Sequence, residues 1–258
     1  MFIIAMVFSA VGFKKYIWFI SIGYGYAIAA IGAGLIFTEQ SHLSPWMTCA
    51  CILLILYGLR LGGFLTYREF KVTTYNAKMK SEIKSGDQIS FLSKCMIWIF
   101  AALLYACQTA PVTFRLANGK GPDPFLIAGI IISAIGLVLE TGADYQKNAA
   151  KKKNPGRFVD TGLFKLVRCP NYFGEMLFWT GCTLGGIPIY QGPAQWIIVL
   201  AGYIGIIYVM FSGARRLEIR QNKTYGDDPE YQAYIRKTPI LIPFVPIYSV
   251  EKHKWLVA

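Results

Sequence analysis

The sequence has few of the residues from which metal and nucleotide sites of soluble proteins are built. It contains only two histidines, His42 and His253, and its six cysteines include no Cys-x-x-Cys pair. A histidine-rich metal site is therefore excluded, and the cysteines are interpreted as small buried apolar residues. Neither a Gly-x-Gly-x-x-Gly after a strand pattern nor a P-loop occurs, which excludes a soluble nucleotide-binding fold.

Charged side chains are also scarce. They make up 16% of the 258 residues, whereas 55% are hydrophobic. Several apolar runs approach the length of about 20 residues that a helix needs to cross the hydrocarbon core of a membrane. We therefore predict an all-α integral membrane protein that forms a single polytopic domain over residues 1–258.

Seven segments are candidates for the membrane-spanning helices of this bundle. The first is short and could instead lie along the membrane surface. The segments are Phe2–Phe13, Tyr16–Phe37, Trp46–Leu65, Cys95–Thr113, Phe125–Leu139, Asn171–Ile187 and Gln195–Ser212.

Lysine and arginine are concentrated in alternate connections between these segments, which explains the net charge of +12. The basic connections are Lys14–Lys15, Tyr67–Lys94, Lys147–Arg168 and the tail from Gly213, whereas the opposite side carries only Arg115 and Lys120. Under the positive-inside rule, this distribution places the N-terminus outside and the C-terminus in the cytosol. Because no base-reading module is visible, we expect no nucleic-acid partner.

The stretch Thr161–Glu175, TGLFKLVRCPNYFGE, is the strongest functional signal. Pro170 suits the first turn of a helix, where its missing N–H is no loss. Asn171 and Glu175 are four residues apart and so share a helix face. Packing of an apolar helix does not require that pair, so we predict a functional amide and carboxylate at the membrane edge.

A row of cations lies on the segment that begins at Trp46. Tyr57 and Arg60 share a face, Arg68 continues it two turns later, and Lys71 lies one turn beyond. An arginine in a membrane span is costly unless it pairs, faces water or extends to the interface, and extension to the interface is the structural alternative for Arg60. A row of cations leading into a bundle would suit an anionic ligand such as a nucleotide.

Three further polar groups are expected on the same side. Glu140 and Asp144 are four residues apart at a predicted helix end, where a solvated end is the alternative to a ligand contact. Lys151 belongs to a lysine run that topology alone would explain, and Arg157 is the better candidate for a ligand contact. The third group forms a polar helical stripe that could instead meet anionic lipid, and it comprises Arg215, Glu218 and Asn222.

From about Glu39 onward the chain resembles the steroid 5α-reductase family in its bacterial branch. The resemblance rests on Tyr57-x-x-Arg60, Asp144-Tyr145, Gly162-Leu163-Phe164, Asn171-x-x-Gly174-Glu175 and Tyr234…Leu241-Ile242-Pro243-Phe244. It implies seven transmembrane helices, NADPH as cofactor, and reduction of the carbon–carbon double bond of 3-oxo-Δ4 steroids. After Arg215 the chain departs from the eukaryotic members, whose histidine-rich helix it lacks.

The resemblance also implies residue roles. Tyr57 corresponds to the catalytic tyrosine that hydrogen-bonds the 3-oxo group, and Glu39 to its carboxylic partner. A donor aimed at that oxygen would stabilise the negative charge that develops during hydride addition. The cofactor-binding residues that the resemblance implies are Arg68, Lys71, Asp144, Arg157, Asn171, Glu175 and Arg215. From the charge pattern alone we add Arg60, Lys151, Glu218 and Asn222 to the predicted set.

A second class of enzyme shares part of this pattern. Membrane methyltransferases of the isoprenylcysteine type, which use S-adenosylmethionine, have a similar stretch to Arg168–Glu175. They have no evident need for a Tyr57–Glu39 pair or for so many cations, so the reductase is the preferred hypothesis. We expect a steroid-like lipid substrate, surrounding membrane lipid and no obligate protein partner. For the location, the bacterial inner membrane is preferred over the alternative, the endoplasmic reticulum.

Overall fold

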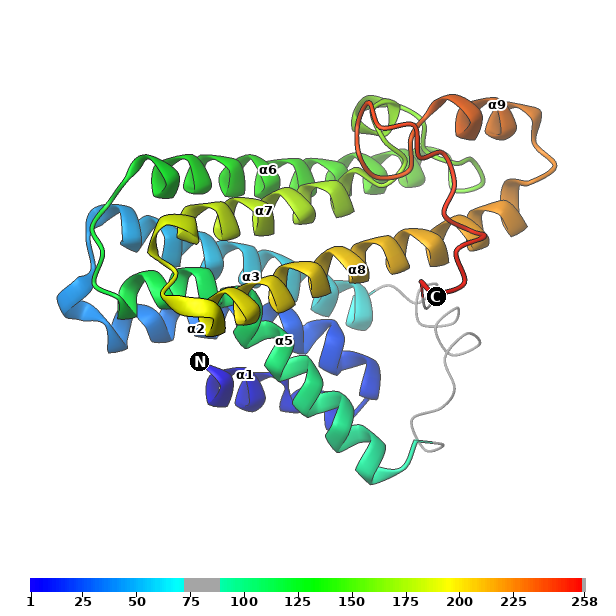
Figure 1. Ribbon diagram of the computed structural model, residues 1–258. Coiled ribbons are helices and arrows are strands. Elements are labelled where there is room, and N and C mark those ends of the chain that lie inside the picture. The colour runs from blue at the N-terminus through cyan, green and yellow to red at the C-terminus, as the bar shows by residue number, and fades with distance from the viewer. Residues whose placement is uncertain (72–88, 257–258) are drawn as a thin grey trace. The chain divides into compact units, whose positions relative to one another are not determined.

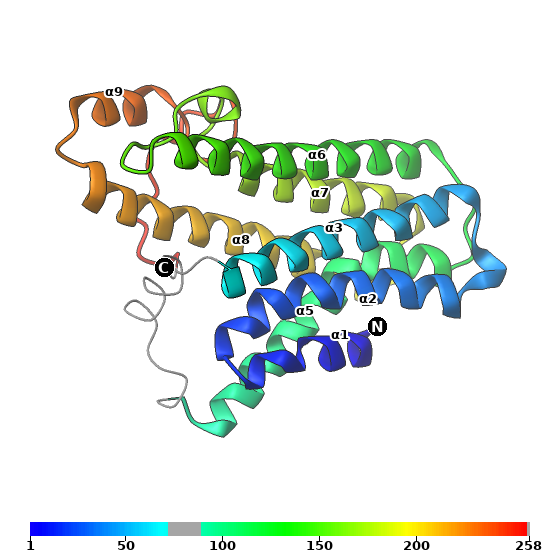
Figure 2. The ribbon, with the colours of Figure 1, turned by 180° about the vertical axis from the view of Figure 1, so that it is seen from behind.

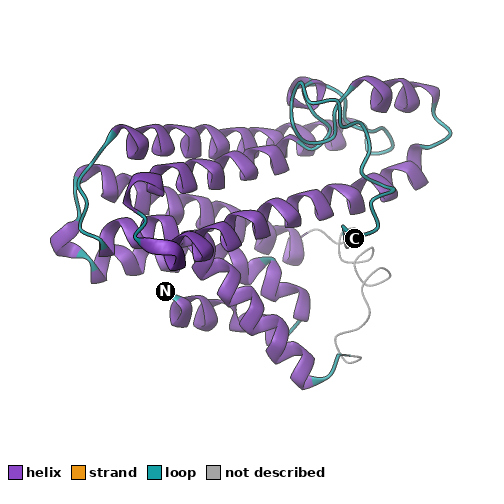
Figure 3. Cartoon of the chain, viewed as in Figure 1, coloured by secondary structure: helices purple, strands orange, loops and turns teal. Residues whose placement is uncertain are grey.

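The computed structural model describes residues 1–71 and 89–256, and within them every regular element is a helix (Figures 1 and 3). Lys78, Lys80 and Lys84 of the predicted basic loop lie outside the described residues. The α-helices are α1 (Phe2–Ser9), α2 (Ile22–Thr38), α3 (Pro45–Lys71), α5 (Phe91–Ala117), α6 (Pro124–Lys153), α7 (Pro170–Gly186), α8 (Gly192–Tyr225) and α9 (Pro229–Lys237). Short 3-10 turns are η1 (Ala10–Phe13), η2 (Tyr16–Ile20), η3 (Gln40–His42), η5 (Gly162–Lys165) and η6 (Ile187–Ile189).

Five of the described helical segments are long and apolar enough to cross a membrane, which confirms the prediction of a helical protein with several apolar spans. They are Tyr16–Thr38, Pro45–Lys71, Phe91–Ala117, Pro124–Lys153 and Gly192–Tyr225. Phe2–Phe13 is a shorter apolar helix, and α7 has 17 residues. The count of seven spans and the sidedness of the termini stay predictions.

Several helices continue well beyond the ends that their apolar runs predict. Helix α6 continues past Leu139 to Lys153, and α8 continues past Ser212 to Tyr225. The predicted loop Lys147–Arg168 therefore begins only at Asn154. Hydrophobicity marks the part of a helix in lipid, whereas the helix itself ends where its backbone is interrupted. The extension of α6 is rich in Ala and Lys and meets no proline until Pro155.

The contacts within the chain define two compact units. Unit 1 comprises residues 1–130 and 182–203, and unit 2 comprises residues 131–181 and 204–258. These units are defined by contacts alone, and whether residues 1–258 fold as a single domain stays a prediction.

Unit 1 is built on an antiparallel hairpin of α2 and α3, which lie side by side in Figures 1 and 2. A Cβ added to Gly58 on α3 would overlap the backbone of Gly25 and Ala29 on α2. Small residues allow such close approach in a membrane, where helices associate by packing rather than by the hydrophobic effect.

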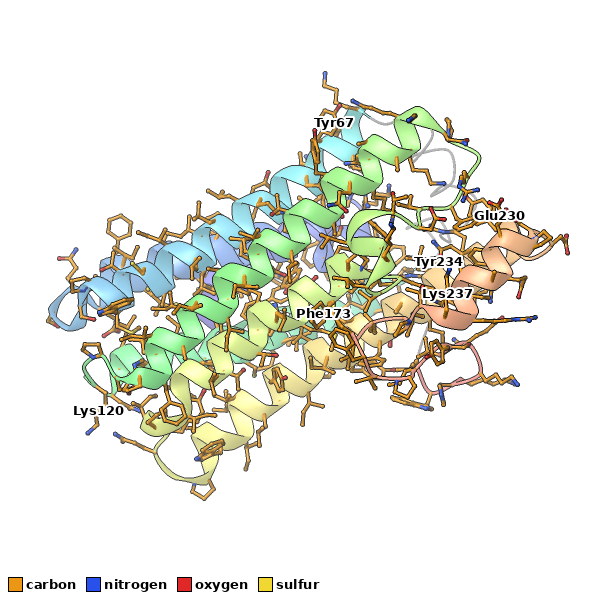
Figure 4. The ribbon with its side chains drawn as sticks, turned by 90° about the horizontal axis from the view of Figure 1, so that it is seen from above. Tyr67, Lys120, Phe173, Glu230, Tyr234 and Lys237 are labelled. Atoms are coloured by element: carbon orange, nitrogen blue, oxygen red, sulfur yellow. The ribbon has the colours of Figure 1, made fainter. Side chains whose placement is uncertain are left out.

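Arg115 ties together one end of unit 1 and is not the loop cation that the sequence predicted. It lies within α5, is 1% exposed and forms an ion pair with Asp123. Its guanidinium also donates to the Gly185 carbonyl at 2.6 Å and to the Gly121 carbonyl at 3.0 Å. Of the two cations predicted on the side opposite to the basic connections, only Lys120 (Figure 4) is therefore exposed within the described residues 114–124.

Unit 2 contains the antiparallel pair of α6 and α7, which lie side by side in Figures 1 and 2. A Cβ on Gly174 would lie 2.6 Å from the Glu140 nitrogen and 2.7 Å from the Gly136 carbonyl oxygen. About one turn before Gly136 in α6, the Ser133 hydroxyl donates to the Phe178 carbonyl at 2.9 Å. These contacts fix the register that positions the polar ends of both helices.

Candidate functional site

Within unit 1, a buried cluster of hydroxyls surrounds Tyr57. The hydroxyls of Tyr24 on α2 and Tyr57 on α3 are 2.9 Å apart, and the two side chains are 7% and 0% exposed. Gln108 on α5 is 3% exposed, and its Nε2 donates to the Tyr24 hydroxyl at 3.5 Å. The Tyr105 ring lies 4.9 Å from that of Tyr24, and its hydroxyl donates to the Phe19 carbonyl. Three helices thus supply one buried polar cluster.

Glu39 lies at the opposite end of α2 from Tyr24, and its predicted pairing with Tyr57 stays a prediction. It follows α2 directly, whereas Tyr24 lies near the start of that helix. Fifteen residues separate them in the sequence, and at a helical rise of 1.5 Å this places Glu39 about 22 Å along the axis. The hydroxyl of Tyr24 is thus a neighbour of the Tyr57 hydroxyl that the sequence did not indicate.

Arg60 and Arg68 flank one aromatic ring on α3. The Phe64 ring lies 5.8 Å from the Arg60 guanidinium carbon and 5.6 Å from that of Arg68. Both arginines are half-buried, and Lys71 at the end of the helix is exposed. Arg60 and Arg68 therefore lie on one face of α3, as predicted, and both guanidinium groups lie near the Phe64 ring.

An open apolar groove lies on α5, close to the hydroxyl cluster. Its volume is about 540 Å³, and its lining is almost entirely hydrophobic. Among its lining residues, Leu104 directly precedes Tyr105 in the sequence and Ile20 directly follows Phe19, whereas none of the buried tyrosines lines it.

In unit 2 the register of α6 and α7 gathers the predicted polar residues at one end of the pair. Glu140 and Glu175 lie next to the Gly136–Gly174 contact, and they are 3% and 6% exposed. Asp144 is one turn beyond Glu140, and Asn171 is one turn before Glu175, so helical spacing brings them to the same end. Glu140 is therefore not at the solvated helix end that its sequence context allowed.

The motif Gly162-Leu163-Phe164 owes its glycine to backbone geometry. Gly162 has φ +61°, and a Cβ there would overlap the side-chain amide of Gln146. The Gln146 Oε1 accepts the Leu163 N–H at 2.9 Å, which holds η5 against α6. Only glycine satisfies both the positive φ and the close approach.

Lys151 and Arg157 are occupied in holding the surface of unit 2. The Lys151 ammonium donates to the Arg157 carbonyl at 2.5 Å and to the Tyr225 hydroxyl at 2.8 Å. Arg157 forms ion pairs with Asp160 and with Glu230 on α9 (Figure 4), and the Glu230 carboxylate raises the pKa of its guanidinium. Both cations thus stabilise the connection after α6.

The predicted stripe on α8 holds the C-terminal segment Tyr248–Leu256. Arg215 donates to the carbonyls of Glu251 and Leu256 at 2.9 and 3.0 Å. Glu218 accepts the Val250 N–H at 2.9 Å, and Asn222 donates to the Glu251 carboxylate at 2.7 Å. These bonds hold the C-terminal segment against α8, and the cofactor contacts predicted for the three side chains stay predictions.

Arg168 is the most deeply buried cation of unit 2. It pairs with Glu218 at 2.8 Å and donates to the Tyr248 carbonyl, while its Nε has no hydrogen-bond partner among the described residues. Burial raises the pKa of the neighbouring Cys169 thiol to about 11, so that thiol stays protonated. An unsatisfied guanidinium donor beside the start of α7 is suited to an anion.

Sequence reasoning missed Tyr24, Gln108 and the buried role of Arg168. Gln108 could have been predicted, because an amide side chain within an apolar span needs a hydrogen-bond partner. Tyr24 carried none, because a tyrosine in a glycine-rich span is equally consistent with ordinary packing.

The long apolar helices and the buried polar clusters define a multi-pass α-helical membrane protein. The particular family is shown by a match of residues 1–238 to the family described as protein of unknown function DUF1295. The chain belongs to that family.

Parts of the chain are similar in sequence to curated proteins. A "Steroid 5-alpha-reductase DET2" from Gossypium hirsutum is 25% identical over 46% of this chain and 42% of its own length. A "3-oxo-5-alpha-steroid 4-dehydrogenase 1" from Rattus norvegicus is 26% identical over 47% of this chain and 42% of its own length. A "Probable O-methyltransferase ustE" from Ustilaginoidea virens is 35% identical over 32% of this chain and 30% of its own length.

The chain spans less than half the length of these curated relatives. No solved structure matches it.

Proposed function

We propose that the protein is an NADPH-dependent reductase of a lipid enone, such as a 3-oxo-Δ4 steroid. The observation that carries the proposal is the Tyr57 hydroxyl, which lies fully buried in an apolar unit and contacts Tyr24. Partial similarity to the plant and rat steroid reductases supports the same reaction.

The chemistry requires a hydrogen-bond donor at the substrate carbonyl. NADPH, when bound, supplies a hydride to the carbon β to that carbonyl. The electrons of the double bond then move toward the carbonyl oxygen and form an enolate, which a proton from water converts to the saturated ketone. Tyr57 would donate to that oxygen, and in a water-poor site such a donor stabilises the developing charge strongly.

NADPH is an anion, and the end of the α6–α7 pair offers groups that suit it. The unsatisfied Nε of buried Arg168 fits a phosphate oxygen, and the first turn of α7 adds the favourable end of the helix dipole. Asn171 and Glu175 would hydrogen-bond the ribose or the carboxamide, together with Asp144. On unit 1, Arg60, Arg68 and Lys71 are the proposed cationic contacts.

Five residues of the predicted cofactor set are better assigned to structural support. Their side chains bind the loop after α6, helix α9 or the C-terminal segment. They are Lys151, Arg157, Arg215, Glu218 and Asn222. They would act on the cofactor only by holding Arg168 and α7 in place.

The test is NADPH consumption by detergent-purified protein with progesterone or testosterone, with the product analysed by mass. We expect NADPH loss in step with a product heavier by two hydrogen atoms. Protein that consumes no NADPH with any 3-oxo-Δ4 steroid, yet binds S-adenosylmethionine, would contradict the proposal.

That second outcome would favour the alternative, a membrane methyltransferase that uses S-adenosylmethionine. The similarity to the probable O-methyltransferase from Ustilaginoidea virens supports it. The cluster of Tyr57, Tyr24 and Gln108 has no evident role in methyl transfer, so the reductase remains the preferred proposal.

We further propose that the basic ends of α6 and α8 face the cytosol of a bacterial cell, with the protein in the inner membrane. Lys152, Lys153, Arg216 and Arg220 near these ends support this sidedness under the positive-inside rule. Cysteine labelling from either side of the membrane would test it.

A further inference from the structure

The C-terminal segment Tyr248–Leu256, at the red end of the ribbon in Figure 1, follows α8 back toward the apolar part of that helix. The Asn222 amide donates to the Glu251 carboxylate at 2.7 Å, and the Tyr208 hydroxyl donates to the Trp255 carbonyl at 2.9 Å. Asn222 comes about four helical turns after Tyr208 in α8. The segment therefore advances along α8 in the direction opposite to that of the helix.

This path brings Trp255 to the end of the apolar run of α8. The run Gln195–Ser212 is about 27 Å long, close to the thickness of a hydrocarbon core, so Ser212 lies near the boundary with the headgroups. Tyr208 lies one turn before Ser212, about 6 Å on the membrane side of it. Because Trp255 accepts the Tyr208 hydroxyl, the segment reaches this boundary instead of ending in water.

The exposed side chains of the segment suit such a boundary. The Trp255 ring lies 6.2 Å from the Tyr208 ring, and the two residues are 66% and 36% exposed. Tryptophan and tyrosine are enriched where a membrane meets water. Lys252 and Lys254, which are also exposed, come just before Trp255 in the sequence. An aromatic pair with two nearby ammonium groups matches the apolar and anionic layers of a phospholipid surface.

The polar stripe on α8 is already engaged in holding this segment. Arg215 donates to the carbonyls of Glu251 and Leu256, and Glu218 accepts the Val250 N–H. The sequence left a contact with anionic lipid open for the stripe. Since the segment covers the stripe, the exposed lysines of the segment are better placed for that contact.

We propose that Tyr248–Leu256 is an interfacial anchor, with Trp255 at the level of the lipid headgroups and with Lys252 and Lys254 binding anionic phospholipids. The chemistry recognised is a phosphodiester anion at the edge of an apolar layer. Each lysine near an anionic surface should strengthen the contact about fivefold, because the surface potential attracts its charge. The anchor is separate from the proposed reductase function and does not rest on it.

The first experiment measures the depth of Trp255 in the full chain, reconstituted in phosphatidylcholine nanodiscs. The emission of the wild type minus that of Trp255→Phe isolates this indole from the other tryptophans. The quenchers are lipid brominated near the top of the acyl chain and iodide in the water. We expect the brominated lipid to quench the Trp255 emission more strongly than iodide does.

The second experiment measures hydrogen exchange at the His253 and Leu256 amides, which donate to carbonyls within the segment. With about 30% phosphatidylglycerol in the nanodisc, exchange should be more than about tenfold slower than in pure phosphatidylcholine, because two lysines act together. Lys252→Gln/Lys254→Gln should remove this difference. High salt should reduce the difference in the wild type, because it screens exposed charges.

The matched control is Lys152→Gln/Lys153→Gln, which removes the same charge from two exposed positions of α6. Lys152 lies about 20 Å beyond Leu139, where the apolar run of that helix ends. These lysines are therefore too far from the boundary to act as the anchor does. The control variant should retain the full effect of phosphatidylglycerol.

Four results would overturn the anchor. Stronger quenching by iodide than by brominated lipid would place Trp255 in water. Equal exchange in the two lipids, or loss of the difference in the control variant as well, would remove the role of Lys252 and Lys254. Equal slowing by inorganic phosphate in pure phosphatidylcholine would reveal a site for soluble anions. Neither experiment measures NADPH consumption, so failure of the reductase proposal would leave the anchor standing.

Discussion

Arg168 and Glu218 form an ion pair at 2.8 Å in which each side chain is only 2% exposed. Replacing one partner leaves an uncompensated buried charge, so Arg168→Met and Glu218→Leu should each lower the free energy of unfolding by about 3–5 kcal/mol. Replacing both should cost less than either alone. Thermal unfolding in detergent measures the three variants.

The matched control is the surface pair of Arg157 and Glu230, whose side chains are 41% and 68% exposed. Exposed pairs contribute little to stability because solvent screens them, so Arg157→Met should barely change the unfolding temperature. Equal losses at both pairs would show that the buried pair is not the stronger constraint.

The close approach of α2 and α3 gives a second prediction. Gly58→Ala adds a methyl group where the backbone of Gly25 and Ala29 already lies, and overpacking of this kind costs about 1–3 kcal/mol. On the same helix, a Cβ at Gly63 meets nothing within 4 Å. Gly63→Ala should therefore be neutral or stabilising by up to about 1 kcal/mol. Comparable melting temperatures for both variants would contradict the proposed packing.

The third prediction concerns acid stability. Burial alone would raise the pKa of Asp123, but the hydrogen bonds from the Leu126 N–H and from Arg115 lower it below its usual value. A carboxyl whose pKa is lowered in the folded state stabilises the fold above its unfolded pKa of about 4. That contribution is lost as the pH falls through the folded value.

Asp123→Asn tests this directly. At pH 7 it should lower the free energy of unfolding by about 1.5–3 kcal/mol, the worth of hydrogen bonds to a charged group. The difference should shrink as the pH falls below about 4 and vanish below the lowered folded pKa of Asp123, because protonation removes the same charge. A constant difference across the pH range would contradict the role of the Asp123 carboxylate.

Gly162 gives a fourth prediction, because its φ of +61° and the adjacent Gln146 side chain leave no room for a Cβ. Gly162→Ala should destabilise unit 2 by about 1–3 kcal/mol. Gly156→Ala is the control, since its nearest neighbour would lie at 4.0 Å. Hydrogen exchange at the Leu163 amide reports the local opening that we expect in the first variant only.

The fifth prediction divides the proposed function between Tyr57 and Asn171. Tyr57→Phe should lower turnover strongly and leave the Kd for NADPH unchanged. Asn171→Ala should weaken NADPH binding by about fivefold to tenfold, the worth of one or two hydrogen bonds. Arg157→Ala, whose cation is already paired, should change neither value by more than about twofold. Equal loss of NADPH affinity in all three variants would contradict this division.

The architecture was largely predictable because apolar length is a direct consequence of the bilayer. The runs at Tyr16–Phe37 and Trp46–Leu65 lie in helices, as expected. The ends were less predictable, since polar sequence such as Glu140–Lys153 continues a helix in water as readily as apolar sequence does in lipid.

The candidate site was predictable only where helical spacing fixes position. Asn171 and Glu175 lie on one helix, so their common face followed from the sequence. The bonds of Arg215 to the C-terminal segment did not follow, because an arginine that binds a cofactor and one that holds a chain terminus have the same local sequence.

Helix α8 has a consequence for the membrane in which the protein works. Its 34 residues extend about 51 Å, whereas the hydrocarbon core is about 30 Å thick. The apolar part ends near Ser212, so Arg215 and its bonds to the C-terminal segment lie just beyond it. A thicker bilayer would draw this junction toward hydrocarbon. Lipid chain length thereby becomes a physical control on how firmly the chain terminus is held.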